Sequence, residues 1–147
     1  MKSNHCICRR LLVMVVTVAV CVTMFGNISK VHAASTYQIK INKQQNCVTI
    51  YKLDSNGKYK PVKAMVCSTG YATPVGTFPL GEKMRWHTLM GPCYGQYCTR
   101  IHGGVLFHSV WYYKQTPSSL SASAYNKLGV TASHGCVRLT VADAKWI

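Results

Sequence analysis

Acidic side chains are almost absent from this chain of 147 residues, which has 3 Asp and Glu residues against 17 Lys and Arg. Each acid has a local structural explanation. Asp54 lies in a turn-forming Asp-Ser-Asn-Gly segment and Glu82 in a loop next to glycine. Asp143 follows Thr140 at the spacing of a helix N-cap. A catalytic triad with a carboxylate is therefore disfavoured, and we expect any catalytic histidine to be oriented by a backbone carbonyl or a hydroxyl.

Sequence motifs of nucleic-acid binding are also absent, although the formal net charge is +14. We therefore expect no nucleic-acid partner. Strong positive charge in an exported protein suits an anionic surface, such as cell-wall polymers with their teichoic acids and peptide carboxylates. Lysines on exposed strand faces can equally serve solubility alone.

A hydrophobic run long enough to span a membrane is missing as well. The apolar stretch 11–25 is shorter than the about 20 residues that a spanning helix needs. It follows a basic N-terminus and precedes Val31-His32-Ala33, which has the pattern of a cleavage site. Residues 1–33 are therefore predicted to be a secretory signal peptide, and 34–147 a single secreted or cell-wall domain. An uncleaved signal would be its only membrane attachment.

The first part of the predicted domain has the pattern of β-strands. Residues 37–41 alternate between apolar and polar side chains, and 48–53 are rich in β-branched residues. Asn56-Gly57 is a strong hairpin signal, and 59–68 forms the expected return strand. Short strands separated by turn signals predict a mainly β domain, a sandwich or barrel.

Three later segments complete the expected fold. Residues 73–81 are punctuated by proline and glycine, which predicts a turn, a strand and a second turn. Residues 113–128 are expected to form a loop or lid with a short helix at 118–122. A helix capped by Thr140 is predicted at the end of the sequence.

The strongest chemical signal is Ser133-His134-Gly135-Cys136-Val137-Arg138-Leu139. Cys136 is a candidate nucleophile, because a thiolate is the strongest nucleophile that proteins offer at neutral pH. Backbone N–H groups near Gly135 could face a developing oxyanion, and the Arg138 guanidinium suits a carboxylate. The alternative from chemistry alone is a structural cysteine in a turn beside a surface arginine.

This segment resembles the signature of the YkuD-type L,D-transpeptidases, bacterial enzymes that cross-link peptidoglycan. Phe107-His108-Ser109-Val110 resembles the catalytic His-Ser element of that family, and residues 73–78 resemble its Thr-Pro-x-Gly-x-Phe segment. The resemblance implies a YkuD-like β-sandwich or barrel with one or two short helices. The implied site is Cys136 as nucleophile, His108 as general base, Ser133, His134 and Gly135 as oxyanion or orienting residues, and Arg138 and Ser109 as substrate-binding residues.

The reaction implied by the resemblance joins peptidoglycan stem peptides. Cys136 would attack the carbonyl at position three of a tetrapeptide stem, forming a thioester that an amine of another stem resolves into a 3→3 cross-link. Attack by water instead would give an L,D-carboxypeptidase, and a non-catalytic, basic cell-wall-binding module is the alternative outside enzymes. No cofactor or metal is needed, and carbapenem inhibition is expected. Relatives continue beyond the terminal helix into another strand, so either the sequence is a fragment or this domain dispenses with that strand.

A second histidine and the other cysteines leave alternatives open. His102, in an Ile-His-Gly-Gly segment, could replace His108 as the base. The residue types of a zinc site occur where Cys93, Cys98, His102 and His108 cluster, but their pairs lie too close together for a zinc finger. In a secreted chain, Cys93 could pair with Cys98 and Cys47 with Cys67, unless all four are buried thiols.

Overall fold

The computed structural model describes residues 35–147, and the predicted signal peptide at 1–33 lies outside them. Within the described residues, no helix combines the length and apolar character that crossing a membrane requires.

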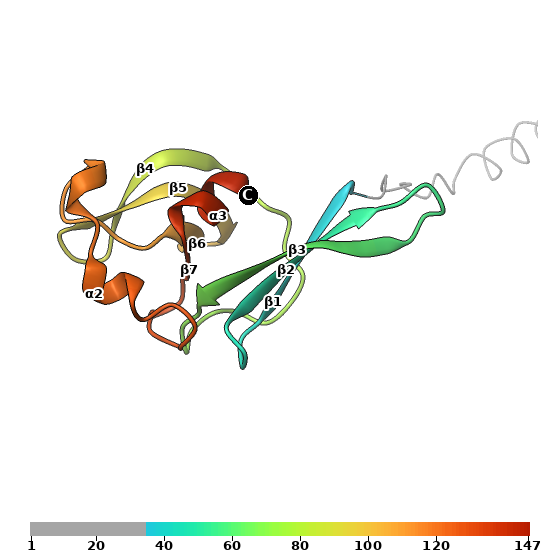
Figure 1. Cartoon of the computed structure of the whole chain (residues 1–147), viewed down its shortest axis with the longest axis horizontal. Coiled ribbons are helices and arrows are strands. Elements are labelled where there is room, and N and C mark those ends of the chain that lie inside the picture. The colour runs from blue at the N-terminus through green and yellow to red at the C-terminus, as the bar shows by residue number, and fades with distance from the viewer. Residues whose placement is uncertain (1–34) are drawn as a thin grey trace, which may run out of the picture. The chain divides into compact units, whose positions relative to one another are not determined.

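Seven strands form one curled, half-barrel sheet, so the expectation of a mainly β domain is confirmed (Figure 1). The sheet order is β1-β2-β3-β7-β6-β5-β4. All neighbours are antiparallel except β6 and β7, which are parallel. The strands are β1 (Tyr37–Asn42), β2 (Cys47–Leu53), β3 (Tyr59–Ser68), β4 (Lys83–Leu89), β5 (Cys93–His102), β6 (Val105–Ser109) and β7 (Val137–Leu139).

The β2–β3 hairpin follows the sequence pattern closely. Gly57 takes the left-handed conformation, with φ 72°, that the Asn-Gly signal predicts. The Asp54 carboxylate closes the turn by accepting the N–H groups of Asn56 and Lys58, each at 2.9 Å. The return strand spans Tyr59–Ser68, as predicted.

Within residues 35–147 there are two short α-helices, α2 (Ala122–Tyr125) and α3 (Val141–Trp146), and one 3-10 turn, η1 (Pro117–Ser119). The expected cap of the last helix is present. The Thr140 hydroxyl accepts the Asp143 N–H at 3.1 Å and donates to the Asp143 carboxylate at 2.9 Å. The stretch 113–128 is mostly loop, and η1 and α2 lie within it.

The strand predicted within residues 73–81 is wrong, because this segment is an irregular loop. Pro74 and Pro79 have no N–H to donate to a ladder. Gly76 has φ 146°, which side chains rarely adopt. The segment therefore forms no strand, although the Gly81 N–H at its end donates to the Arg100 carbonyl of β5 at 2.9 Å.

The hydrophobic core occupies one face of the sheet, and α3 packs against it. In β6 and β7, Phe107, Val137 and Leu139 are buried in this core, together with Ala144 and Ile147 from the end of the chain. Successive residues of a strand point to opposite faces. The residues between these core positions are thereby directed to the other face of the sheet.

Candidate active site

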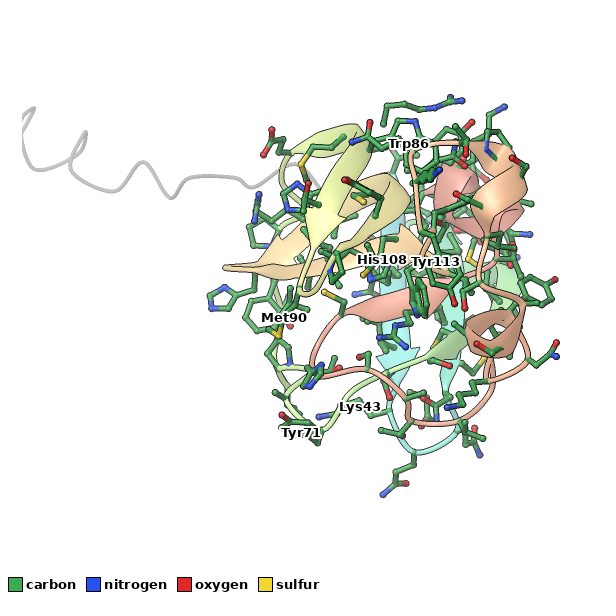
Figure 2. The ribbon with its side chains drawn as sticks, turned by 90° about the vertical axis from the view of Figure 1, so that its left-hand side faces the viewer. Lys43, Tyr71, Trp86, Met90, His108 and Tyr113 are labelled. Carbon is green, nitrogen blue, oxygen red and sulfur yellow. The ribbon has the colours of Figure 1, made fainter. Side chains whose placement is uncertain are left out.

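The parallel pairing of β6 and β7 brings the predicted base and nucleophile segments together. His108 lies opposite Arg138 in the register, and Phe107 lies opposite Val137. His108 and Arg138 therefore share the face that points away from the core, and Cys136 precedes Arg138 by two positions. Figure 2 shows His108 near the middle of the view, with the labelled Trp86, Tyr113, Met90 and Tyr71 around it.

In the turn that carries Cys136, the carbonyl groups of residues 134–136 all accept hydrogen bonds. His134 accepts from the Ala72 N–H (2.9 Å), Gly135 from the Thr73 hydroxyl (2.7 Å), and Cys136 from the Ser133 hydroxyl (2.5 Å). In contrast, the N–H groups of the same three residues donate to no protein acceptor within residues 35–147. Unpaired N–H groups beside a nucleophile are the donors that an oxyanion requires.

Residues 69–73 hold this turn from one side. The Thr69 carbonyl accepts the N–H groups of Ala132 and Ser133, at 3.1 and 3.2 Å. Gly70 lies so close that a Cβ there would stand 2.5 Å from the His134 carbonyl carbon. Glycine is therefore required at this position for the two backbones to touch.

His108 is buried, with 2% of its surface exposed, and its Nδ1 lies 2.5 Å from the Ser109 carbonyl oxygen. Because a carbonyl only accepts, Nδ1 carries the proton and Nε2 keeps its lone pair. Burial lowers the pKa of His108 to about 4; the Ser109 hydrogen bond opposes this, and the charges of Arg138 and His87 add to it. His108 is therefore neutral near pH 7, as a general base must be.

A backbone carbonyl thus orients the histidine, as the scarcity of acids predicts. All three acidic side chains form ion pairs with other residues: Asp54 with Lys60, Asp143 with Lys63, and Glu82 with Arg100.

The Ser109 side chain is fully buried and serves the sheet. Its hydroxyl accepts the Gln96 N–H at 2.9 Å and donates to the Val110 carbonyl at 2.8 Å, which ties β6 to β5. The predicted contact of Ser109 with substrate stays a prediction. Ser109 instead positions His108, because its carbonyl oxygen accepts the hydrogen bond from Nδ1 of the ring.

Tyr97, a residue of β5 with left-handed backbone, affects which β5 residues face His108. Tyr97 has φ 51°, which is unusual for an aromatic residue. The Cζ atom of Arg85 lies 4.3 Å from the centroid of the Tyr97 ring. The local irregularity lets Gly95 and Cys98 face the same side, although they are an odd number of positions apart. A Cβ on Gly95 would stand 3.0 Å from the Cys98 sulfur and 3.1 Å from the His108 ring. Glycine at 95 therefore leaves room for the imidazole.

Arg138 supplies a positive charge without a carboxylate partner. Its Nη1 donates to the Ala132 carbonyl at 2.8 Å, while its buried Nε has no hydrogen-bond partner among residues 35–147. Burial lowers the pKa of this guanidinium, and interactions with Cys136 and Cys93 raise it. An unpaired N–H on a buried cation favours an incoming anion.

The structure places His102 at the end of β5, two positions before Gly104, whose carbonyl oxygen lies 3.8 Å from the Cys136 sulfur. His102 is exposed, and its ring packs on Phe78 with centroids 4.7 Å apart.

Of the residues of the zinc alternative, Cys98 and His108 both lie against Gly95, while the Cys93 sulfur lies 3.6 Å from the Met90 carbonyl oxygen. No group of three metal-binding side chains occurs in the described part of the chain.

The two suggested disulfide pairs are wrong, because all five cysteines within residues 35–147 are free thiols. Cys47 lies opposite Val66 in the register, so Cys67 points to the other face. Cys93 and Cys98 are separated along one strand by about 16 Å, at roughly 3.3 Å per residue, beyond disulfide reach. Burial raises the pKa of Cys67 and of Cys98 to about 12, so both behave as apolar thiols.

Sequence patterns missed four residues that shape the site: Gly70, Thr73, His87 and Gly95. Thr73 lies in the family-like segment 73–78, but the residues around it in the sequence do not indicate a contact with the distant Gly135. His87 lies opposite Gly95 in the β4–β5 register and affects the charge state of His108 through space. Only the pairing of strands reveals either relation.

Burial of neutral His108 predicts acid sensitivity of the fold. The unfolded chain binds this proton near pH 6.5, and the folded protein only near about 4. The stabilisation is therefore complete above about pH 7 and is lost as the pH falls from 6.5 to 4. Its size is about 3 kcal/mol, from about 1.4 kcal/mol per pKa unit.

Urea unfolding of the wild type and of His108→Gln, at pH 7.5 and pH 4, measures this contribution. We expect the wild type to lose about 3 kcal/mol more than the variant between the two conditions. His102→Gln, which changes an exposed histidine, should keep the wild-type pH dependence. Equal losses in the wild type and His108→Gln would contradict the assignment.

Comparison with known proteins identifies the family of this chain. Residues 36–147 match the family model described as the YkuD L,D-transpeptidase catalytic domain. A Bacillus subtilis (strain 168) protein named "Putative L,D-transpeptidase YciB" is 42% identical over 80 residues, which cover 52% of this chain and 40% of that relative. The chain therefore spans well under two thirds of the length of this curated relative.

Two crystal structures share the fold. One is a fused Zn-dependent amidase/peptidase/peptidoglycan-binding domain-containing protein from Clostridium acetobutylicum ATCC 824, with TM-score 0.57, 24% identity, and coverage of 77% of this chain and 46% of that one. The other is an L,D-transpeptidase (Yku) from Stackebrandtia nassauensis, with TM-score 0.51, 19% identity, and coverage of 83% and 54%. With the family match over most of the chain, the motifs and the sheet lead to one conclusion: this chain belongs to the YkuD family of L,D-transpeptidase catalytic domains.

Proposed function

We propose that this domain is a cysteine L,D-transpeptidase that acts on peptidoglycan tetrapeptide stems through a thioester on Cys136. The observation that carries the proposal is the turn at residues 134–136, whose three carbonyls accept hydrogen bonds while its three N–H groups have no acceptor within residues 35–147. A neutral histidine with a free Nε2 lies on the same face of the sheet. Together these provide a nucleophile, a base and an oxyanion site without a metal.

The reaction begins with transfer of the Cys136 proton to Nε2 of His108. The sulfur then adds to the carbonyl carbon at position three of the stem, and the carbonyl electron pair moves to the oxygen. The free N–H groups of His134, Gly135 and Cys136 are positioned to stabilise that oxyanion. Collapse breaks the bond to the terminal D-amino acid, whose amine takes the proton from His108, and a thioester remains.

An amine of a second stem resolves the thioester in the reverse sense, which gives the 3→3 cross-link and frees Cys136. Water in place of the amine would make the domain an L,D-carboxypeptidase. The Arg138 guanidinium lies opposite His108 in the register and has no carboxylate partner within residues 35–147, which favours a substrate carboxylate near the reacting bond. Ser109 supports the base through its carbonyl.

The basic composition and the signal-like sequence at 1–33 support a location outside the cytoplasm, in contact with the wall. Anionic wall polymers are then natural electrostatic partners. The same features would also suit a non-catalytic wall-binding module, so the reactivity of Cys136 is the property that separates the two functions.

Intact-protein mass after incubation with a carbapenem tests the enzyme. We expect one covalent adduct on the wild type and none on Cys136→Ala, because acylation needs the thiolate. Cys93→Ala, which removes another partly exposed thiol, should still form the adduct. Absence of an adduct on a protein shown to be folded by circular dichroism would contradict the enzyme and favour the binding module.

Purified tetrapeptide muropeptides with an acceptor stem then separate transfer from hydrolysis. Cross-linked dimers would identify a transpeptidase. Tripeptides alone would identify a carboxypeptidase.

A further inference from the structure

We propose that Thr73 is a positioning residue of the oxyanion site, which acts by fixing the orientation of the Gly135–Cys136 peptide unit. This inference rests on the proposed function, since it concerns the step in which an oxyanion develops. Within residues 35–147, Thr73 forms no hydrogen bond with the Cys136 sulfur or with the His108 side chain. Its effect passes through one peptide plane.

The hydrogen bonds of the Thr73 hydroxyl have a defined direction. The oxygen accepts the Gly70 N–H at 2.8 Å, and a backbone N–H can only donate. The hydroxyl proton is therefore free to point to the Gly135 carbonyl oxygen, which is 2.7 Å away and can only accept. With 4% of Thr73 exposed, bulk water has little access to compete for these bonds.

The peptide that Thr73 holds is the one that carries the Cys136 N–H. The Gly135 C=O and the Cys136 N–H belong to a single planar unit and point in opposite directions. Holding the carbonyl toward Thr73 therefore aims the N–H to the opposite side, where it has no protein acceptor within residues 35–147. Rotation of this peptide would place a carbonyl oxygen where the developing negative charge needs a donor.

The support for Thr73 is itself anchored. Lys43 Nζ lies 2.5 Å from the Thr73 carbonyl oxygen, and the neighbouring Ala72 N–H holds the His134 carbonyl at 2.9 Å. Gly70 is packed directly against the turn. The hydroxyl is thus presented from a backbone that is fixed on both sides, which a positioning residue requires.

Two reactions of the same sulfur separate positioning of the oxyanion donor from activation of the thiol. Acylation by a carbapenem passes through an oxyanion. Alkylation by iodoacetamide is a direct displacement of iodide, in which the sulfur–carbon bond forms without any oxyanion. Both rates can be followed at Cys136 by mass spectrometry of the digested protein, across a range of pH.

Thr73→Val removes the hydroxyl at nearly constant volume, and Thr73→Ser retains it. We expect Thr73→Val to slow acylation by about tenfold or more. The loss should be smaller than the about 10²–10³-fold loss that follows removal of an oxyanion donor itself. Thr73→Ser should stay within about threefold of the wild type. Alkylation rates and their pH profiles should agree within about twofold in all three proteins.

Wild-type acylation by Thr73→Val would overturn the inference, as would a parallel fall of acylation and alkylation, which would place the effect at the thiol. If Thr73→Val does not fold, Thr73→Ala makes the same comparison with a smaller side chain. A wild type that alkylates but never acylates would instead overturn the proposed function, so the two failures are distinguishable.

Discussion

Replacement of His108 by glutamine should slow acylation of Cys136 by about 10²–10⁴, the usual contribution of a general base. Glutamine keeps the size and polarity of the side chain but cannot take the thiol proton at neutral pH. The neutral, Nδ1-protonated imidazole of the native site is ready to take it. Second-order rate constants for carbapenem acylation, followed by intact mass, measure the loss.

The matched control is His102→Gln, because His102 is the other histidine with a catalytic-like sequence context. It is exposed and its ring packs on Phe78, whereas His108 is buried and lies opposite Arg138 in the register. Its acylation rate should stay within about twofold of the wild type. A large loss in His102→Gln with little effect in His108→Gln would reverse the assignment of the base.

Replacement of Gly70 by alanine should damage both stability and reactivity. The new Cβ would stand 2.5 Å from the His134 carbonyl carbon and 2.6 Å from the Gly135 nitrogen, and neither backbone atom can move without moving the turn. Overpacking of this kind costs about 1–3 kcal/mol. A displacement of the turn by up to about 1 Å can slow acylation by up to about 10²-fold.

Gly81→Ala is the matched control, because it makes the same glycine-to-alanine change at a position with more space. A Cβ at 81 would meet the Arg100 side chain at 3.5 Å, an ordinary contact. Urea unfolding and carbapenem acylation of both variants should show near-native values for Gly81→Ala and losses for Gly70→Ala. If Gly70→Ala were as stable and as reactive as Gly81→Ala, residues 69–73 would not hold the turn tightly.

Local chemistry made several parts of this fold predictable. The Asn56-Gly57 signal and the β-branched runs determine the β2–β3 hairpin, and the Thr140 cap determines the start of α3. The scarcity of acids predicted that a backbone carbonyl or a hydroxyl, not a carboxylate, would orient the histidine, and the Ser109 carbonyl does so. In each case the relevant partners lie within a few positions of one another in the sequence.

What escaped prediction depends on partners that are distant in sequence. The contact between Thr73 and Gly135 joins residues separated by 62 positions, and no local pattern specifies which hydroxyl will meet which carbonyl. The left-handed Tyr97 is another example, since an aromatic residue gives no hint of that conformation. The strand expected within residues 73–81 does not form, because Pro74, Pro79 and the φ of Gly76 disfavour a ladder there.

The position of β7 has a consequence for the order of folding. β7 is the last of the seven strands to be synthesised, yet it lies between β3 and β6 and joins two antiparallel ladders. Until it pairs, each ladder has an unpaired edge, and such long-range pairing is slow. Cys136 immediately precedes this strand. The Cys136 thiol is therefore positioned in the same event that joins the two ladders, and the acylation that we propose for it should appear only after β7 has paired.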